Sequence, residues 1–242
     1  MSWQRRCGAV RCGEPRYAAC GATLRWQSTM PRRRTGNDAA KLIPRRPTLT
    51  ATRAAAEDCR ACDLWKRATQ TVFGEGSATA TLMLIGEQPG DAEDLSGHPF
   101  VGPAGQLLDR ALAAAGIDRA AIYVTNVVKH FSWEPRGKRR IHKKPRISET
   151  QACRPWLDVE IALVKPRAII CLGATAAQTL LGRDFKVTAH RGEFVASPLA
   201  GLVLATVHPS AILRQTDRHA REQERERFIA DLRSVARALS LR

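Results

Sequence analysis

The sequence predicts an α/β fold, a three-layer αβα sandwich in which helices cover both faces of a central, mainly parallel β-sheet. Short apolar runs that end in glycine or a polar motif alternate along the chain with segments of helical periodicity. The runs lack polar alternation, which is typical of parallel strands buried on both faces. With 242 residues, 44% of them hydrophobic, the chain is long enough to bury one full core.

Residues 1–50 are expected to form a basic, disordered extension, and residues 51–242 a single domain. The extension holds eleven Lys or Arg against two acidic residues and shows no apolar period. An Arg-rich, acid-poor start resembles an organelle transit peptide, but an over-extended reading frame with initiation at Met30 explains it at least as well. The three cysteines of the extension have no ligand-like spacing and receive no function.

The first half of the domain contains two predicted helices and two predicted strands. Residues 51–67 are compatible with a helix that carries Cys59-x-x-Cys62, and the run TLMLIG at 81–86 predicts a buried strand stopped by glycine. Residues 104–115 place five apolar side chains on one helical face, with Gly116 as the stop. The run AIYVTN at 121–126 predicts the second strand.

The second half continues the alternation. Residues 132–147 are polar and basic without either period, which predicts an exposed loop. A helix at 149–164 precedes the strand RAIICLG at 167–173, and a helix follows at 174–182. A last strand at 201–207 ends at His-Pro-Ser, 208–210, and a charged amphipathic helix from about 218 to 239 closes the domain.

Charge and hydropathy narrow the class of partner. The formal net charge is +16 and only 5% of the residues are aromatic, which favours nucleic acid over an acidic small molecule or a membrane. No stretch approaches the roughly 20 apolar residues of a membrane span, and the N-terminus lacks the apolar region of a secretory signal. We therefore expect a soluble, cytoplasmic protein.

Three polar motifs follow predicted strands. They are GEQPGD after the first strand, Asn126 at the end of the second and His208-Pro-Ser after the last. Ligands of open parallel sheets bind beyond the carboxyl ends of the strands, so the motifs are expected to meet at one site. Each motif alone would be a turn, a cap or loop filler.

Together with HPFVGPAG at 98–105, these motifs make the chain, from about Cys59 onward, similar to the iron–sulfur (family 4-like) branch of the uracil-DNA glycosylase superfamily. The run KRRIH at 138–142 resembles the UdgX subgroup. The resemblance implies a DNA-repair enzyme whose pocket holds a flipped-out uracil, with Phe100 stacked on the base and Asn126 bound to its Watson–Crick edge. His208 would stabilise the negative charge that builds on the departing base.

The resemblance to the UdgX subgroup further implies a covalent step. The imidazole of His142 would capture C1′ of the sugar and trap the protein on the abasic DNA in a single turnover; histidine supplies a neutral nitrogen nucleophile near pH 7. Gln88 stands where well-known uracil glycosylases carry the aspartate that positions water. The neighbouring Glu87 would orient the histidine, with Asp91 as a further participant.

DNA contact is expected from the basic loop and from the His-Pro-Ser motif, through Lys138, Arg139, Arg140 and Ser210. The plainer interpretation of KRRIH is a solvated loop that only contacts phosphates. Thymine would be excluded by a side chain near the uracil C5 position, within Gly90–Asp94.

A [4Fe–4S] cluster is expected, with Cys59, Cys62, His130 and Cys153 as its ligands. His130 stands where the resembled branch has its third cysteine, and histidine can replace cysteine on iron. The alternatives are recruitment of Cys171, which the apolar run around it marks as a buried small hydrophobe, and an incomplete cluster. Zinc would accept the same ligands.

The partner is therefore expected to be uracil-containing DNA, single-stranded as well as double-stranded, bound by a monomer that associates with the nucleoid through DNA. Two alternatives remain open. One is a conventional glycosylase that turns over and releases free abasic DNA. The other is a non-catalytic, metal-containing DNA-binding module, whose binding would depend on salt and ignore uracil.

Overall fold

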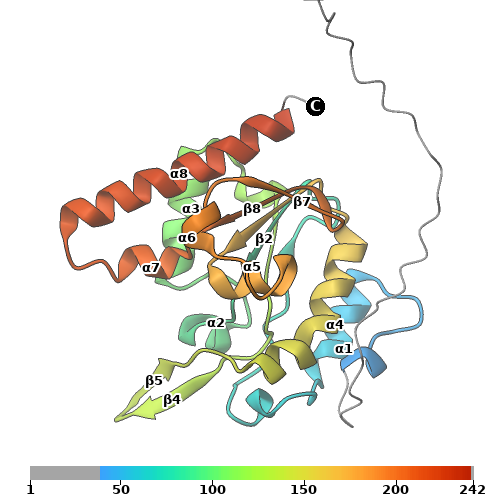
Figure 1. The fold of residues 1–242 in the computed structure, drawn as a ribbon. Coiled ribbons are helices and arrows are strands. Elements are labelled where there is room, and N and C mark those ends of the chain that lie inside the picture. Colours follow the sequence, from blue (N-terminus) through green and yellow to red (C-terminus); the bar gives the residue numbers. More distant parts are fainter. Residues whose placement is uncertain (1–38, 241–242) are drawn as a thin grey trace, which may run out of the picture. The chain divides into compact units, whose positions relative to one another are not determined.

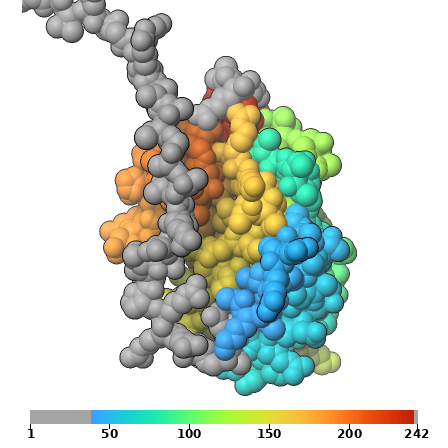
Figure 2. All heavy atoms as spheres, turned by 90° about the vertical axis from the view of Figure 1, so that its right-hand side faces the viewer, coloured from blue at the N-terminus to red at the C-terminus, as the bar shows by residue number. Residues whose placement is uncertain are grey.

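The computed structural model describes residues 39–240, so the expected extension lies outside the described residues except for its last twelve positions. In that stretch a 3-10 turn, Ala39–Lys41, precedes the first helix, α1 (Leu49–Glu57), which is capped by the hydroxyl of Thr48. Ala39 is fully buried. Figure 2 shows these first described residues, in blue, lying against the yellow surface of α4 (Ile147–Val164). The packed part of the chain thus extends back at least to Ala39.

The central sheet confirms the predicted strands. Its six strands lie in the order β1 (Glu75–Gly76), β3 (Tyr123–Asn126), β2 (Leu82–Gly86), β6 (Ala168–Leu172), β8 (Ala200–Thr206) and β7 (Phe194–Ser197). The four inner strands are parallel, and the two edge strands are antiparallel to their neighbours. Every residue of β2, β3 and β6 is buried, as their unbroken apolar runs predict.

Helices cover both faces of this sheet, so the three-layer sandwich is confirmed (Figure 1). Leu82 and Leu84 of β2 face a core closed by α3 (Pro103–Ala114), α7 (Pro209–Leu213) and α8 (Arg218–Ser240). Met83 and Ile85 face the opposite core, with α1, α4, α5 (Ala174–Leu181) and α6 (Val187–His190). None of the helices described within residues 39–240 combines the length and apolarity of a bilayer span.

The expected helix at 51–67 is wrong in its second half. The helix α1 ends at Glu57, and a short 3-10 helix, Asp63–Lys66, follows after a turn. Cys59 is buried in that turn, whereas Cys62 is half-buried. Burying the thiol of Cys59 against α4 overrides the weak helical pattern of this stretch.

The expected exposed loop at 132–147 is also wrong in part, because it contains a β-hairpin. Strands β4 (Trp133–Arg136) and β5 (Arg139–His142) pair with each other and leave a two-residue turn. Gly137, first in that turn, has a φ of 59°, as a tight hairpin turn of this length requires. Figure 1 shows the hairpin extending from the body of the domain near α2 (Asp91–Ser96). Its outer residues are solvated, so no apolar alternation marks it in the sequence.

Candidate active site

A cavity of about 480 Å³ opens at the carboxyl ends of the inner strands, where the strand order reverses between β2 and β6. It gathers most of the residues that the strand-end motifs pointed to. The lining includes Glu87, Gln88, Phe100, Asn126, His142 and His208. The structure therefore brings together side chains from five separate segments of the sequence.

Gly86 forms the floor on which three of these side chains converge. A Cβ atom at this position would lie 2.4 Å from Asn126 Oδ1, 2.7 Å from Phe100 Cζ and 3.5 Å from His208 Nε2. Phe100 is held with a φ of 60°, a left-handed conformation that is costly for a bulky residue. Asn126 Oδ1 is buried and has no hydrogen-bond partner among the described residues, so it is free to accept a hydrogen bond from a ligand.

His208 is presented to the cavity as a neutral hydrogen-bond donor. The backbone N–H of Ser210 donates to His208 Nδ1 over 3.1 Å, which places the ring proton on Nε2. Burial lowers the pKa of His208 to about 4, so the ring is uncharged at pH 7. The hydroxyl of Ser210, one of the expected DNA contacts, lies 2.9 Å from the same Nδ1 and accepts from Arg214, so it helps to orient His208.

Glu87 and His142 contact each other at the wall of the cavity. His142 Nε2 lies 3.2 Å from Glu87 Oε1, and the hydroxyl of Thr175 donates to the other carboxylate oxygen. Burial acts against the charge of Glu87, but the hydrogen bonds from His142 and Thr175 outweigh it and hold the pKa of Glu87 below its ordinary value. Sequence reasoning missed Thr175, although it follows the end of β6 as the predicted residues follow their strands.

Gln88 anchors the hairpin. Its side-chain amide donates to the carbonyl oxygens of Ser132 and Lys143 over 3.0 and 3.1 Å, and its Oε1 accepts from the Ser132 N–H over 3.0 Å. Ser132 and Lys143 flank the two hairpin strands, which a backbone hydrogen bond also closes at this point. Gln88 thus lines the cavity as expected, and its amide fastens the base of the hairpin.

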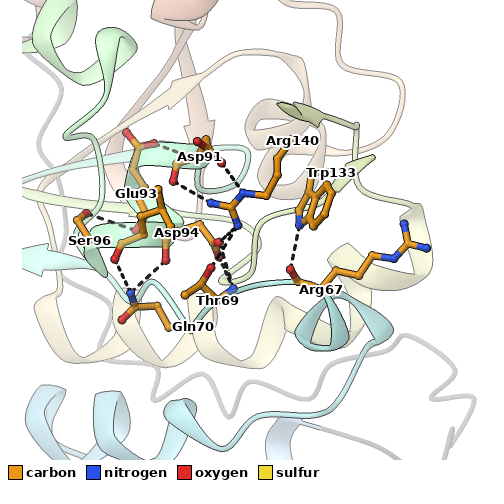
Figure 3. Close-up of polar contacts among 11 residues, drawn as sticks. Arg67, Thr69, Gln70, Asp91, Glu93, Asp94, Ser96, Trp133 and Arg140 are labelled. Carbon is orange, nitrogen blue, oxygen red and sulfur yellow. Dashed lines mark hydrogen bonds and ion pairs between the residues drawn. The ribbon is translucent and has the colours of Figure 1, made fainter. Parts of the chain in front are cut away.

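Arg140, one of the expected DNA contacts, fastens the hairpin to α2 in this structure (Figure 3). Its guanidinium reaches Asp91 Oδ1 over 2.6 Å and Asp94 Oδ2 over 2.5 Å, and it lies 5.6 Å from the ring centroids of Phe131 and Trp133. Burial disfavours its charge, but these carboxylates raise the pKa of Arg140 above its ordinary value. Asp91 is correspondingly engaged with Arg140. Of the expected DNA contacts, the side chains of Lys138 and Arg139 are exposed.

The loop between β2 and α3 is closed by a second carboxylate, that of Glu93. Its two oxygens accept from the backbone N–H groups of Gly90, over 3.0 Å, and Gly102, over 2.8 Å. Both Gly90 and Glu93 line the cavity. They are the cavity-lining members of the segment expected to exclude thymine.

A fully buried ion pair supports the end of β3. Lys129 Nζ donates to Glu160 Oε2 over 2.5 Å, to Thr125 Oγ1 over 2.6 Å and to the carbonyl oxygen of Asn126 over 2.8 Å. The side chains of Lys129 and Glu160 are 1% and 0% exposed. The pair fixes the backbone of Asn126 from below, and sequence reasoning missed it because the partners lie on different elements.

The expected metal ligands are only partly brought together. Cys59 and Cys62 lie near enough to Cys153 to contribute to its raised pKa. N–H donors point at two of the sulfur atoms, from the Trp156 indole to Cys59 over 3.2 Å and from the Lys129 backbone to Cys153 over 3.3 Å. Such hydrogen bonds suit thiolate ligands. The fourth expected ligand, His130, instead has its Nε2 3.0 Å from the Thr71 hydroxyl.

Within residues 39–240, no three His, Cys, Asp or Glu side chains are arranged as metal ligands. Burial raises the pKa of Cys153 to about 12, so the thiol is protonated unless a metal displaces the proton. Cys171 lies in the apolar core against α5, as the sequence predicted for a small buried hydrophobe. Cys59, Cys62 and Cys153 therefore lie in one region without being arranged as a ligand set, and His130 would have to leave its hydrogen bond to Thr71 to complete one.

Known proteins resemble this chain over the segment that builds the cavity. The model of the uracil DNA glycosylase superfamily matches residues 73–233. A type-4 uracil-DNA glycosylase of Pyrobaculum aerophilum is 38% identical over 166 residues, 66% of this chain and 81% of the relative. The type-4 uracil-DNA glycosylase of Archaeoglobus fulgidus is 35% identical, over 73% of this chain and 86% of the relative. The type-4 uracil-DNA glycosylase of Thermotoga maritima is 37% identical, over 67% of this chain and 82% of the relative.

Proposed function

Because this chain belongs to the uracil DNA glycosylase superfamily, we propose that it excises uracil from DNA and becomes covalently linked through His142 to C1′ of the abasic site. One observation carries the proposal. His142, in contact with the half-buried carboxylate of Glu87, lies on the wall of the cavity whose floor collects Phe100, Asn126 and His208.

Uracil recognition follows from the side chains on the floor. The ring of Phe100 offers a stacking face for a flipped-out base. The buried Asn126 Oδ1 accepts from uracil N3–H while its amide N–H donates to O4, an arrangement that cytosine cannot match. The fixed carboxylate of Glu93, near the Gly90 turn, crowds the C5 side and excludes the methyl group of thymine.

Excision breaks the bond between C1′ and uracil N1, and its electron pair leaves with the base. His208 Nε2–H donates to uracil O2 and stabilises the negative charge that collects there. A neutral histidine can act in this way without first losing a proton. The sugar is left as an oxocarbenium-like electrophile at C1′.

In the next step His142 captures the sugar, and the atoms and protons balance as follows. A ring nitrogen of His142 gives its lone pair to C1′ and forms the new C–N bond, which makes the imidazole cationic. Glu87 stabilises that cation and takes its remaining N–H proton, which passes to the uracil anion as it leaves. Gln88, with its amide committed to the hairpin, offers no carboxylate to activate water, so hydrolysis does not compete.

We further propose that the chain is of the UdgX subgroup and acts as a monomer in the cytoplasm, on single-stranded as well as double-stranded DNA. The exposed Lys138 and Arg139 of the hairpin would contact phosphates next to the extruded nucleotide. Such contacts give binding that weakens steeply with salt.

A [4Fe–4S] cluster held by Cys59, Cys62, Cys153 and His130 is part of the proposal, supported by the gathered thiols and their N–H donors. The cluster would tie the segment after α1 to α4 and supply structural rather than redox chemistry. Iron, acid-labile sulfide and a brown colour in purified protein would support it. Colourless protein with one equivalent of zinc would replace it by a zinc site of the same ligands.

A denaturing gel tests the function. Protein incubated with a labelled uracil-containing oligonucleotide should yield a slowly migrating adduct that thymine-containing DNA does not give. With His142→Ser the adduct should vanish while uracil release persists. Free abasic DNA from the wild-type protein would establish a conventional glycosylase instead, and salt-sensitive binding without any base release would leave a non-catalytic module.

A further inference from the structure

Thr175 lies on the side of Glu87 opposite His142. It is the second residue of α5, 8% exposed, and its hydroxyl donates to Glu87 Oε2 while Glu87 Oε1 faces His142. The position of Thr175 is itself fixed. The Gly173 N–H donates to the carbonyl oxygen of Thr206 over 2.8 Å, which ties the start of α5 to the end of β8.

We propose that Thr175 is a positioning residue for the trapping step, one that holds the Glu87 carboxylate in place against His142. The inference rests on the proposed function. Thr175, Glu87 and His142 form a row of three contacting side chains in which the hydroxyl orients the carboxylate and the carboxylate orients the histidine. A carboxylate with a partner on each oxygen cannot rotate about its last bond without breaking one contact.

The hydrogen bond from Thr175 matters because other charged or polar groups surround the Glu87 carboxylate. The Glu87 carboxylate interacts electrostatically with His142 on β5 and with His208, the residue before α7. Arg214, after α7, also interacts electrostatically with His208. Lys144 also lines the cavity. Without the hydroxyl, the carboxylate would be free to turn toward these other groups, and its ionised form would lose a hydrogen bond.

The effect is expected on trapping and not on excision. Thr175 contacts Glu87, whereas the groups that bind and polarise the base converge above Gly86. Removing the hydroxyl should therefore slow capture of the sugar and leave base release unchanged. A residue that merely supported the fold would slow both steps together.

The test compares adduct formation with free uracil release, in single turnover on a uracil-containing oligonucleotide between pH 5 and pH 9. Thr175→Val keeps the size and removes the hydroxyl, and Thr175→Ser restores it. Thr179→Val is the matched control, because it removes a neighbouring threonine hydroxyl of the same helix that bonds only to backbone.

We expect Thr175→Val to slow adduct formation about tenfold at pH 7, the order expected for one hydrogen bond to a charged group. The acid limb of its pH profile should move to higher pH, since the carboxylate loses a donor that favours its charge. Uracil release should stay at the wild-type rate, and Thr175→Ser and Thr179→Val should match wild type in both assays.

Adduct formation by Thr175→Val at the wild-type rate and pH profile would overturn the inference while the proposed function stands. A parallel loss of uracil release and adduct would also overturn it, as the sign of a structural role. If the wild-type protein releases uracil without forming an adduct, the proposed function itself fails, and the inference with it.

Discussion

Replacing Arg140 with Gln should release the hairpin that carries His142. The guanidinium bonds Asp94, whose side chain is 0% exposed, and Asp91, whose side chain is 53% exposed. The buried contact is expected to contribute about 1.5–3 kcal/mol, and the exposed pair at most about 1 kcal/mol after screening. The docked hairpin should therefore lose about 1.5–4 kcal/mol. Because about 1.4 kcal/mol is a factor of ten, the docked population relative to the undocked one falls by roughly tenfold to several hundred-fold.

The consequence should appear in trapping before it appears in excision. At saturating protein we expect Arg140→Gln to form adduct at least about tenfold more slowly and to release uracil within about threefold of the wild-type rate, because the base-binding side chains converge above Gly86 and none of them belongs to the hairpin. Hydrogen exchange should show faster exchange of the hairpin amides.

Arg139→Gln is the matched control, since Arg139 is an exposed arginine on the same strand. It should weaken DNA binding alone. If Arg140→Gln forms adduct at the wild-type rate although its hairpin amides exchange faster, this reasoning is refuted. The position of His142 would then not depend on the contacts of Arg140 with Asp91 and Asp94.

Three further results are expected. Gly86→Ala should lower uracil release at least about 100-fold with little change in Tm, because its methyl group would lie 2.4 Å from Asn126 Oδ1; release within tenfold of wild type would contradict this. Lys129→Met should cost about 3–5 kcal/mol in urea unfolding by leaving the buried Glu160 unpaired, and adding Glu160→Gln should recover much of the loss; no recovery would argue against the ion pair. His208 has a pKa of about 4 in the folded protein, so between pH 6.5 and pH 4 the unfolded chain binds more protons than the folded one. The free energy of unfolding should therefore fall as pH falls through this window. His208→Gln should show a smaller fall, and an equal fall would contradict the low pKa of His208.

The sequence predicted the inner strands and long helices because burial on both faces of a parallel sheet leaves an uninterrupted apolar run. The cavity followed from one topological rule. Polar residues after parallel strands meet at one edge, and this rule placed GEQPGD, Asn126 and His208 at one site, whereas Phe100 was assigned to it by the family resemblance.

The sequence did not predict the hairpin or the contacts of Arg140 with Asp91 and Asp94, for a physical reason. Strands β4 and β5 bury little surface, so their residues carry no apolar alternation. Arg140 reads as a phosphate contact in a basic run, and only the fold brings Asp91 and Asp94, more than forty positions earlier, within its reach. Likewise, Lys129 follows an apolar run with nothing nearby in the sequence to announce Glu160.

The separateness of the hairpin has an evolutionary consequence. Its strands pair with each other and with no other strand of the described chain, residues 39–240, and the register of the six-stranded sheet does not depend on them. Insertions or deletions in such an appendage are tolerated far better than changes in the sheet. The hairpin can therefore change in length or sequence over evolutionary time while the strand order and register that hold Gly86, Asn126 and His208 are kept.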